Sequence, residues 1–130
     1  MLSSEILWRD DFCRVVLLND ASYPGYCRVE LLAHVKEMTD LPIHQRSRLM
    51  KVVFIVEQAI RDVLQPKKIN LASLGNKTPH LHWHVLPRFE DDKHFPNSHW
   101  GEAVRDNTYS ALNEETITKL KLAISIFLKD

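Results

Sequence analysis

Three histidines alternate with large apolar residues in the run His80-Leu81-His82-Trp83-His84-Val85. Alternation with a period of two is typical of a half-buried strand, because successive side chains of a strand point to opposite faces. We therefore predict that Leu81, Trp83 and Val85 pack into the core and that the three histidines share the other face. An imidazole can serve as nucleophile, general base, general acid or metal ligand. The sequence therefore places its candidate chemistry on this strand.

Two other interpretations of the histidine row stay open. A His-x-His pair on a strand can supply two zinc ligands, and a third partner can then complete an open site. The chain contains further histidines that could do so, namely His34, His44, His94 and His99. It has no Cys-x-x-Cys pair and no His-Glu-x-x-His helix, and a purely structural row is the third interpretation. We favour a metal-free site, because an ordinary imidazole pKa of about 6.5 leaves most of the ring neutral and nucleophilic at pH 7.

The same residues resemble a known family. The run from His80 to Leu86 matches the His-φ-His-φ-His-φ-φ signature of the histidine triad (HIT) superfamily, where φ is apolar. Gly75-Asn76 resembles the Gly-Gln or Gly-Asn pair that precedes the triad. Residues 17–25 resemble the nucleoside-binding strand and its turn, so that the likeness covers about residues 12–88. Residues 88–96 are similar to bacterial members described as diadenosine tetraphosphate hydrolase-like.

The resemblance implies both an activity and catalytic residues. It implies a nucleotide hydrolase or transferase that cleaves a phosphoanhydride or phosphoramidate bond, with a dinucleoside polyphosphate as the expected substrate. His82 would be the nucleophile and form a covalent nucleotidyl-histidine. His80 and His84 would orient it and donate hydrogen bonds to phosphate oxygens, and Asn76 would hold the phosphate or the leaving group. A module that binds AMP-like ligands with little turnover is the alternative from another class.

Further nucleotide-binding residues are also implied by the resemblance. Asn19 would bond the ribose hydroxyls, and Asn70 would lie on the phosphate side. Lys77 or Thr78 falls where the family often has Ser or Thr. A lysine facing the pocket would suit a longer polyphosphate, whereas one facing water is an ordinary loop residue. Tyr26 stands where many members have a fourth histidine, and a phenol can donate one hydrogen bond but cannot take an imidazole's charge.

Composition narrows the classes of protein. The 130 residues are expected to form one domain over 1–130. Lysine and arginine balance aspartate and glutamate, 17 against 17, so we expect no nucleic-acid or membrane partner. Cys13 and Cys27 are expected to be reduced, buried thiols on neighbouring strands. We expect a cytoplasmic protein, because no leader or spanning segment is visible. No cofactor is expected to be required, because a neutral imidazole can attack without a metal. The resemblance implies a homodimer that pairs edge to edge through its sheet.

The elements that must position the histidines follow from the remaining patterns. Residues 12–18 and 26–32 read as strands joined by a turn over 19–25. A helix capped by Asp40, with Pro42 in its first turn, ends at Gln65-Pro66. Its expected inner stripe is Leu49, Val53, Val56, Ile60 and Val63. Lys67-Lys68 is expected to be a solvated end, with phosphate attraction as the minor alternative.

The second half of the chain completes the predicted fold. Residues 69–74 read as a core strand, 75–79 as a loop and 80–88 as the histidine strand. Residues 89–112 are predicted to be irregular. Asn113 is expected to cap a terminal amphipathic helix with the inner stripe Ile117, Leu120, Ile124, Phe127 and Leu128. The order predicts an α+β fold with a HIT-like, mostly antiparallel sheet, one long crossing helix and a C-terminal helix.

Overall fold

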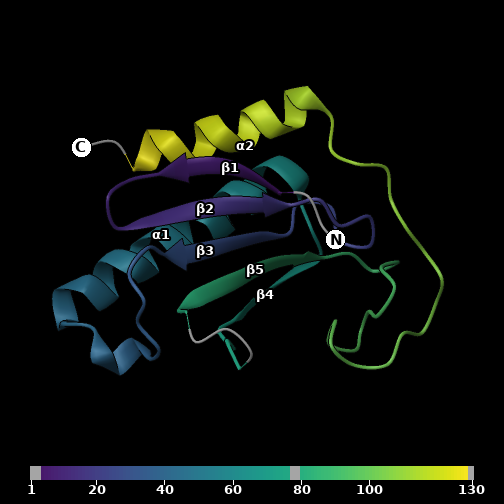
Figure 1. Ribbon diagram of the computed structural model, residues 1–130. Coiled ribbons are helices and arrows are strands. Elements are labelled where there is room, and N and C mark those ends of the chain that lie inside the picture. Colours follow the sequence, from purple (N-terminus) through teal and green to yellow (C-terminus); the bar gives the residue numbers. More distant parts are fainter. Residues whose placement is uncertain (1–3, 77–79, 129–130) are drawn as a thin grey trace.

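The computed structural model describes residues 4–76 and 80–128 and shows one antiparallel sheet with two α-helices (Figure 1). The strands stand in the order β1-β2-β3-β5-β4. The elements are β1 (Ser4–Arg9), β2 (Cys13–Leu18), β3 (Cys27–Leu31), a short 3-10 helix (Met38–Asp40), α1 (Ile43–Leu64), β4 (Lys68–Ala72), β5 (His82–Arg88) and α2 (Glu114–Phe127). The predicted α+β class and the antiparallel sheet are confirmed.

The two faces of the sheet differ because strand side chains alternate. Val15, Val29 and Trp83 are register partners on one face, and α1 crosses that face (Figure 1). The inner side of α1 there buries Leu49, Val52, Val53, Val56, Ala59 and Ile60. Arg28 and His84 are register partners on the other face, which carries no helix. The fold thus stabilises one face by apolar burial and leaves the other for the histidines.

The helix α1 begins later than the sequence indicated. Its N-cap is Pro42, whose carbonyl accepts from the N–H groups of Gln45 and Arg46. Asp40 was expected to be the cap, but this residue ends the preceding 3-10 helix and its carboxylate accepts from the Glu37 N–H. The expectation for Asp40 is therefore wrong: the aspartate caps the short helix and the proline starts the long one. The predicted stop at Gln65 is confirmed by its left-handed conformation.

The turn after β2 requires a glycine. Gly25 has a φ of +87°, and a Cβ at this position would lie 2.2 Å from Leu64 Cδ1. Any side chain would therefore clash with the last turn of α1. This close approach fixes where β3 begins, and β3 carries several residues of the candidate site.

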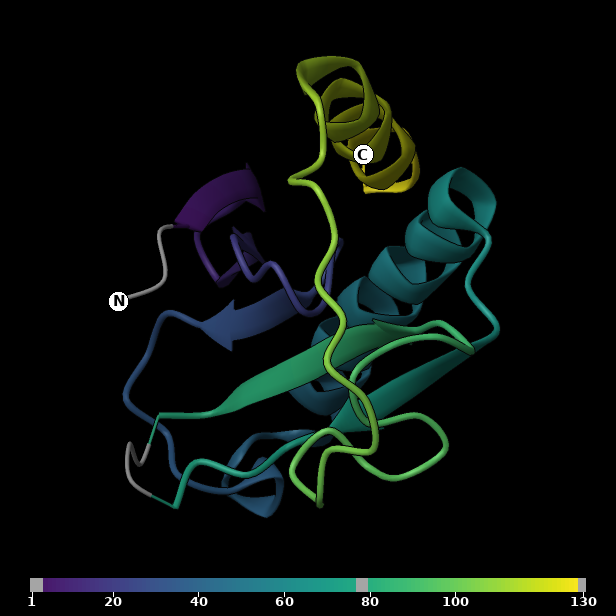
Figure 2. The same ribbon diagram turned by 90° about the vertical axis from the view of Figure 1, so that its right-hand side faces the viewer.

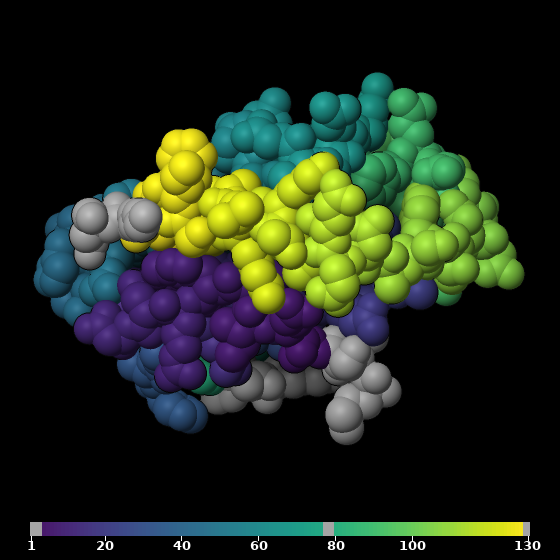
Figure 3. All heavy atoms as spheres, turned by 90° about the horizontal axis from the view of Figure 1, so that it is seen from above, coloured from purple at the N-terminus to yellow at the C-terminus, as the bar shows by residue number. Residues whose placement is uncertain are grey.

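The terminal helix α2 packs against α1 and β1. Seen from above, it lies between the purple N-terminal strand and the teal helix α1 (Figure 3). The predicted Asn113 cap is confirmed, because its side chain accepts from the Thr116 N–H at 2.8 Å. Leu120 and Ile124 are fully buried, but Phe127 is 62% exposed, so its place in the inner stripe is wrong. This ring instead lines a cavity with Phe54 and Ile55 of α1.

The strand β1 was not predicted. Only Leu7 of its six residues is buried, and Ile6 is 45% exposed. A strand with so weak an apolar pattern is recognised only through its partner, β2. Both cysteines are buried and free on the neighbouring strands β2 and β3, as expected. Neither helix in the described part of the chain has the length and apolar character needed to cross a membrane.

Candidate active site

His82 lies at the start of β5 with a defined tautomer. Its Nδ1 is 2.7 Å from the carbonyl oxygen of His80. A carbonyl only accepts, so Nδ1 must carry the proton and donate it. The lone pair of this ring is therefore on Nε2, the nitrogen available for attack. The backbone at His82 is held in turn by the Ser73 hydroxyl, which donates to the His82 carbonyl at 2.9 Å.

His84 lies beside His82 on the same face, as predicted. The two rings are 5.0 Å apart and nearly perpendicular. The Tyr26 hydroxyl is 2.5 Å from His84 Nδ1. Burial, followed by the charges of His82, Arg28 and His99, lowers the pKa of His84 to about 4. Burial likewise raises the pKa of Tyr26 to about 12. Both groups are therefore neutral at pH 7, and the phenol can donate to Nδ1.

His80 does not share the strand position that the alternation predicts. The strand begins only at His82, and the His80 side chain turns toward the end of β3. Its Nε2 donates to the Leu31 carbonyl at 2.5 Å, and its ring stacks on His34 at 4.7 Å. The expectation that all three histidines lie on this strand is thus corrected to two, His82 and His84, with His80 anchoring the entry to the strand. The alternation does hold for Leu81 and Val85, which are buried.

A cavity of about 220 Å³ opens beside His80 and His82. Its other walls are Leu81 and three charged residues of β2 and β3, namely Arg14, Arg28 and Glu30. Nothing in the sequence had linked these charges to the site. The alternation of β3 placed Arg28 and Glu30 on the open face, but only the strand register sets them opposite His84 and His82.

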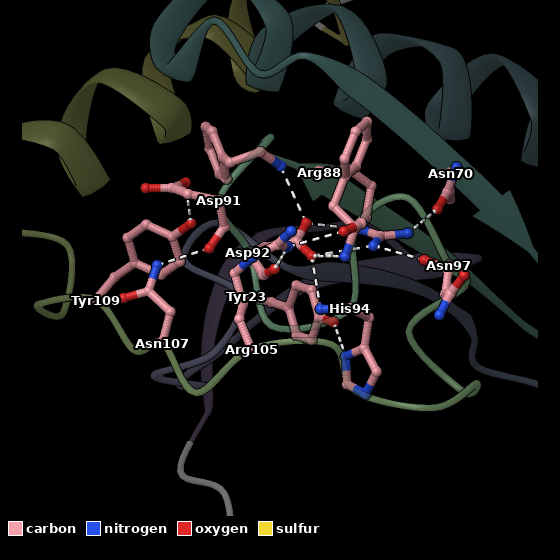
Figure 4. A network of polar contacts seen from close by, with 12 residues as sticks. Tyr23, Asn70, Arg88, Asp91, Asp92, His94, Asn97, Arg105, Asn107 and Tyr109 are labelled. Atoms are coloured by element: carbon pink, nitrogen blue, oxygen red, sulfur yellow. Dashed lines mark hydrogen bonds and ion pairs between the residues drawn. The ribbon is translucent and has the colours of Figure 1, made fainter.

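The other boundary of the site is formed by the 89–112 segment, which follows β5 and has no helix or strand. It loops over one end of the sheet in green (Figure 2). Its base is an ion pair between Arg88 and Asp92, whose side chains are 3% and 0% exposed. Arg88 also donates to the Asn70 side chain and the Asn97 carbonyl, as Figure 4 shows.

The Asp92 carboxylate organises the loop around it. It accepts from the backbone N–H groups of Phe89, His94 and Phe95 as well as from Arg88. Burial alone would raise the pKa of Asp92, but the hydrogen bonds from Arg88 and these N–H groups outweigh it and hold the pKa below its usual range. Arg105 then donates to the Asp92 and Phe95 carbonyls and so connects the second half of the loop to the first.

The segment delivers two aromatic groups to the site. The Trp100 ring meets the His84 ring edge-on at 5.6 Å. His99 lies 5.8 Å from the Tyr26 ring, and burial together with Arg88 and His94 lowers its pKa to about 4. The neighbouring His94 bonds the Tyr23 hydroxyl through its Nδ1. No periodic pattern in the sequence indicates these contacts.

The residues expected to bind nucleotide are dispersed. Asn70 accepts from Arg88 at 2.9 Å and lines a cleft of about 940 Å³ beside β4, together with His99 and Trp100. Asn76 is exposed at the end of the described stretch. Asn19 lines a different cavity, of about 220 Å³, beside Gly25 and the start of α2. Lys77 and Thr78 lie outside the described residues. The roles of all five stay predictions.

The described residues do not form a ready-made metal site. Across residues 4–76 and 80–128, no three His, Cys, Asp or Glu side chains come together as a group that could hold a metal ion. His34 and His80 stack with each other, and the rings of His94 and His99 both contact that of Tyr23. Three of the four further histidines thus make ring contacts.

Comparison with known proteins identifies what the chain is similar to. The HIT domain family model matches residues 2–91. A histidine triad protein from Marinobacter aquaeolei is 25% identical, with a TM-score of 0.74 over 96% of this chain and 88% of that one. A histidine triad protein from Bradyrhizobium japonicum is also 25% identical, with a TM-score of 0.75 over 95% and 89%.

A third solved structure shares the fold. A zinc-bound histidine triad family protein from Mycobacterium smegmatis is 21% identical, with a TM-score of 0.65 over 96% of this chain and 86% of that one. At this identity the likeness concerns the fold alone. No curated protein matches the chain.

Proposed function

The chain belongs to the HIT domain family, and from that premise we propose that it is a nucleotide hydrolase or transferase that cleaves a phosphoanhydride or phosphoramidate bond through His82. The observation that carries the proposal is the 2.7 Å hydrogen bond from His82 Nδ1 to the His80 carbonyl. This bond holds the ring in the tautomer whose Nε2 can attack.

The first step forms a covalent intermediate. The Nε2 lone pair attacks phosphorus, and the bond from phosphorus to the leaving group breaks with its electron pair. The product is an Nε2-nucleotidyl imidazolium that keeps its Nδ1 proton. The His80 carbonyl then accepts from a charged donor, and such bonds are stronger than neutral ones. The same contact therefore stabilises the intermediate more than the resting ring.

The second step returns the free enzyme. Water, or another acceptor in a transfer reaction, attacks phosphorus, and the electron pair of the phosphorus–nitrogen bond returns to Nε2. A proton leaves the attacking water, so the products are a nucleoside monophosphate and neutral His82. The protein groups used in both steps are imidazoles, a phenol and a backbone carbonyl, so we propose that no metal is required.

His84 and Tyr26 support the same reaction. When the phenol donates to His84 Nδ1, the remaining proton of His84 lies on Nε2 and can bond a phosphate oxygen. Because the pKa of His84 is lowered to about 4, this ring donates as a neutral group at pH 7. Charge that develops on the phosphate oxygens is then met by a preorganised donor.

The finer assignment is a dinucleoside polyphosphate hydrolase of the diadenosine tetraphosphate type. It is supported by residues 88–96, in which Arg88, Asp92 and Phe95 form the base of the loop beside the histidines. Asn76, Asn19, Asn70, Lys77 and Thr78 keep their proposed nucleotide-binding roles. A cytoplasmic homodimer completes the proposal.

A panel of nucleotides assayed in EDTA tests the proposed function. It should contain dinucleoside polyphosphates, nucleoside diphosphates and a nucleoside 5′-phosphoramidate. We expect turnover in EDTA and trapping of radiolabelled nucleotide on the protein after an acid-free quench. Activity that disappears in EDTA and returns with zinc would favour the metal hydrolase, and tight binding without turnover would favour the binding module.

A further inference from the structure

Two arginines and a glutamate lie next to the histidines on the open face of the sheet. In the antiparallel register, Glu30 is opposite His82 and Arg28 is opposite His84. Arg14 is in turn opposite Glu30 on the next strand. Directly paired residues on one face have Cβ atoms about 4.5–5.5 Å apart. The charges are therefore immediate neighbours of the reacting groups.

One carboxylate holds both guanidinium groups. Glu30 accepts from Arg14 Nε at 2.7 Å and from Arg28 Nη2 at 2.9 Å. Its side chain is 14% exposed, against 40% and 34% for Arg14 and Arg28. The trio therefore carries one net positive charge, although the whole chain has a formal net charge of zero.

Arg28 has donor capacity that the trio leaves unused. Its Nε atom is buried and has no hydrogen-bond partner among the described residues. A guanidinium presents five N–H donors in a planar fork that fits two oxygens of a phosphate. The buried Nε is closed to a ligand as the side chain stands, whereas the rest of the guanidinium belongs to a side chain that is 34% exposed and lines the cavity.

The cavity bounded by the trio, His80, Leu81 and His82 is small. Its volume is about 220 Å³, and a water molecule in the liquid takes up about 30 Å³. It can therefore take a short chain of phosphate groups but has no room for a nucleoside as well. Since His82 is one of its walls, a phosphate chain bound here would lie beside His82.

We propose that Arg28, supported by Arg14, binds the phosphate groups of the leaving portion of the substrate, so that the site selects nucleotides with an oligophosphate leaving group. The inference rests on the proposed function and adds to it the residues that would bind the leaving group. Glu30 holds the two guanidinium groups in place before binding, and it competes with the incoming phosphates for the same donors.

Binding of inorganic tripolyphosphate tests the anion site without turnover. By calorimetric titration we expect Arg28→Gln to bind it at least about tenfold more weakly, because a charge-assisted contact is lost. Glu30→Gln should bind it a few times more tightly, because the competing carboxylate is gone. A purely structural trio predicts the opposite sign for Glu30→Gln.

Arg48→Gln is the matched control. Arg48 also pairs with two carboxylates, Asp10 and Asp11, but it lies on α1 away from the cavity. Its substitution should leave tripolyphosphate binding unchanged. Thermal unfolding must show that each variant is folded. The proposal is overturned if the unsubstituted protein fails to bind tripolyphosphate, or if Arg28→Gln and Arg48→Gln behave alike.

A pair of substrates separates leaving-group binding from a general effect on the histidines. With a dinucleoside tetraphosphate, Arg28→Gln should lose about ten- to a hundredfold in kcat/KM. With a nucleoside 5′-phosphoramidate, which has no phosphate in its leaving group, the loss should stay below about threefold. Equal losses on both would overturn the proposal. If neither substrate is turned over by the unsubstituted protein, the proposed function fails, and the tripolyphosphate result still decides on the anion site.

Discussion

The histidines of β5 and those of the 89–112 segment are positioned in different ways. His82 and His84 stand on a strand whose ladder hydrogen bonds and register set their spacing. His94 and His99 stand on an irregular loop that is folded around one buried carboxylate, Asp92. The reacting groups are thus placed by many weak, regular contacts, and the wall beside them is organised around one buried ion pair and the hydrogen bonds to it. Substitutions of the β5 histidines should therefore lower the catalytic rate, whereas a substitution at the base of the loop should lower the stability of the fold.

The largest expected effect lies on the strand. His82→Asn should lower kcat by at least about a thousandfold, because the nucleophilic nitrogen is removed outright. Nucleotide affinity should change little. Steady-state kinetics on the best substrate of the panel, with binding measured separately, checks both parts. If His82→Asn kept near wild-type turnover on every phosphoanhydride, His82 could not be the nucleophile.

His80→Asn is the matched comparison within the same row. It should be milder, on the order of ten- to a hundredfold in kcat. The carbonyl that orients His82 belongs to the backbone and survives this change, whereas the side-chain bond to the Leu31 carbonyl does not. An effect as large as that of His82→Asn would mean that the side chain itself takes part in the chemistry.

The next largest effect is a loss of stability, expected when the ion pair at the base of the 89–112 segment is broken. Asp92→Asn leaves Arg88 buried without its counter-charge, and breaking a buried pair in this way costs about 3 kcal/mol or more. Urea unfolding at pH 7 measures it. Asp11→Asn, which removes an exposed carboxylate paired with Arg48, should cost less than about 1 kcal/mol.

Acid should remove the same stabilisation. The pKa of Asp92 is lowered in the folded chain, so its contribution is fully present above the unfolded value near 3.8 and is lost as the pH falls through the lower folded value. The difference in unfolding free energy between the unsubstituted protein and Asp92→Asn should therefore narrow below about pH 4. A difference that is constant from pH 7 to pH 2 would contradict the ion pair as its source.

Tyr26 contacts both regions, through His84 of the strand and His99 of the loop, and its substitution should have a smaller effect. Tyr26→Phe removes the phenol that bonds His84, and we expect kcat to fall about tenfold. Nitrogen NMR should show His84 changing from one predominant tautomer to a mixture. With the phenol in place, His84 should begin to take up a proton only as the pH approaches about 4. An unchanged tautomer and rate would mean that burial alone orients this ring.

The dimer prediction concerns the edge next to both regions. β4 is the end strand of the sheet, and natural proteins pair, cover or charge such edges. The aromatic residues of 95–100 and the exposed Phe127 offer further contact area. Light scattering should give about twice the chain mass of 15.2 kDa. A monomer at micromolar concentration would count against this assembly.

The smallest expected effect is that of metal removal. Protein purified without added metal should contain no stoichiometric zinc, and chelation should leave its rate unchanged. Elemental analysis that finds about one zinc per chain, bound through His80 or His84, would overturn the mechanism. Zinc held only near His94 and His99 would leave it intact, because those rings do not attack the substrate.

The sequence by itself determined the elements whose apolar residues follow a periodic pattern. Alternation around His82 and His84 predicted their shared face, and the stripe from Leu49 to Ile60 predicted the inner side of α1. These patterns are local, since a strand has a period of two and a helix a period of 3.6. The family resemblance likewise depended on residues that are close in the chain.

The tertiary structure decided what depends on distant partners. β1 is recognised only once β2 lies beside it, and His80 leaves the row because the Leu31 carbonyl, 49 residues away, accepts its proton. Strand register sets Arg28 and Glu30 opposite the histidines, and the buried pair of Arg88 and Asp92 brings Trp100 to His84. Such contacts join residues with no fixed spacing in the sequence, so a periodic pattern cannot predict them.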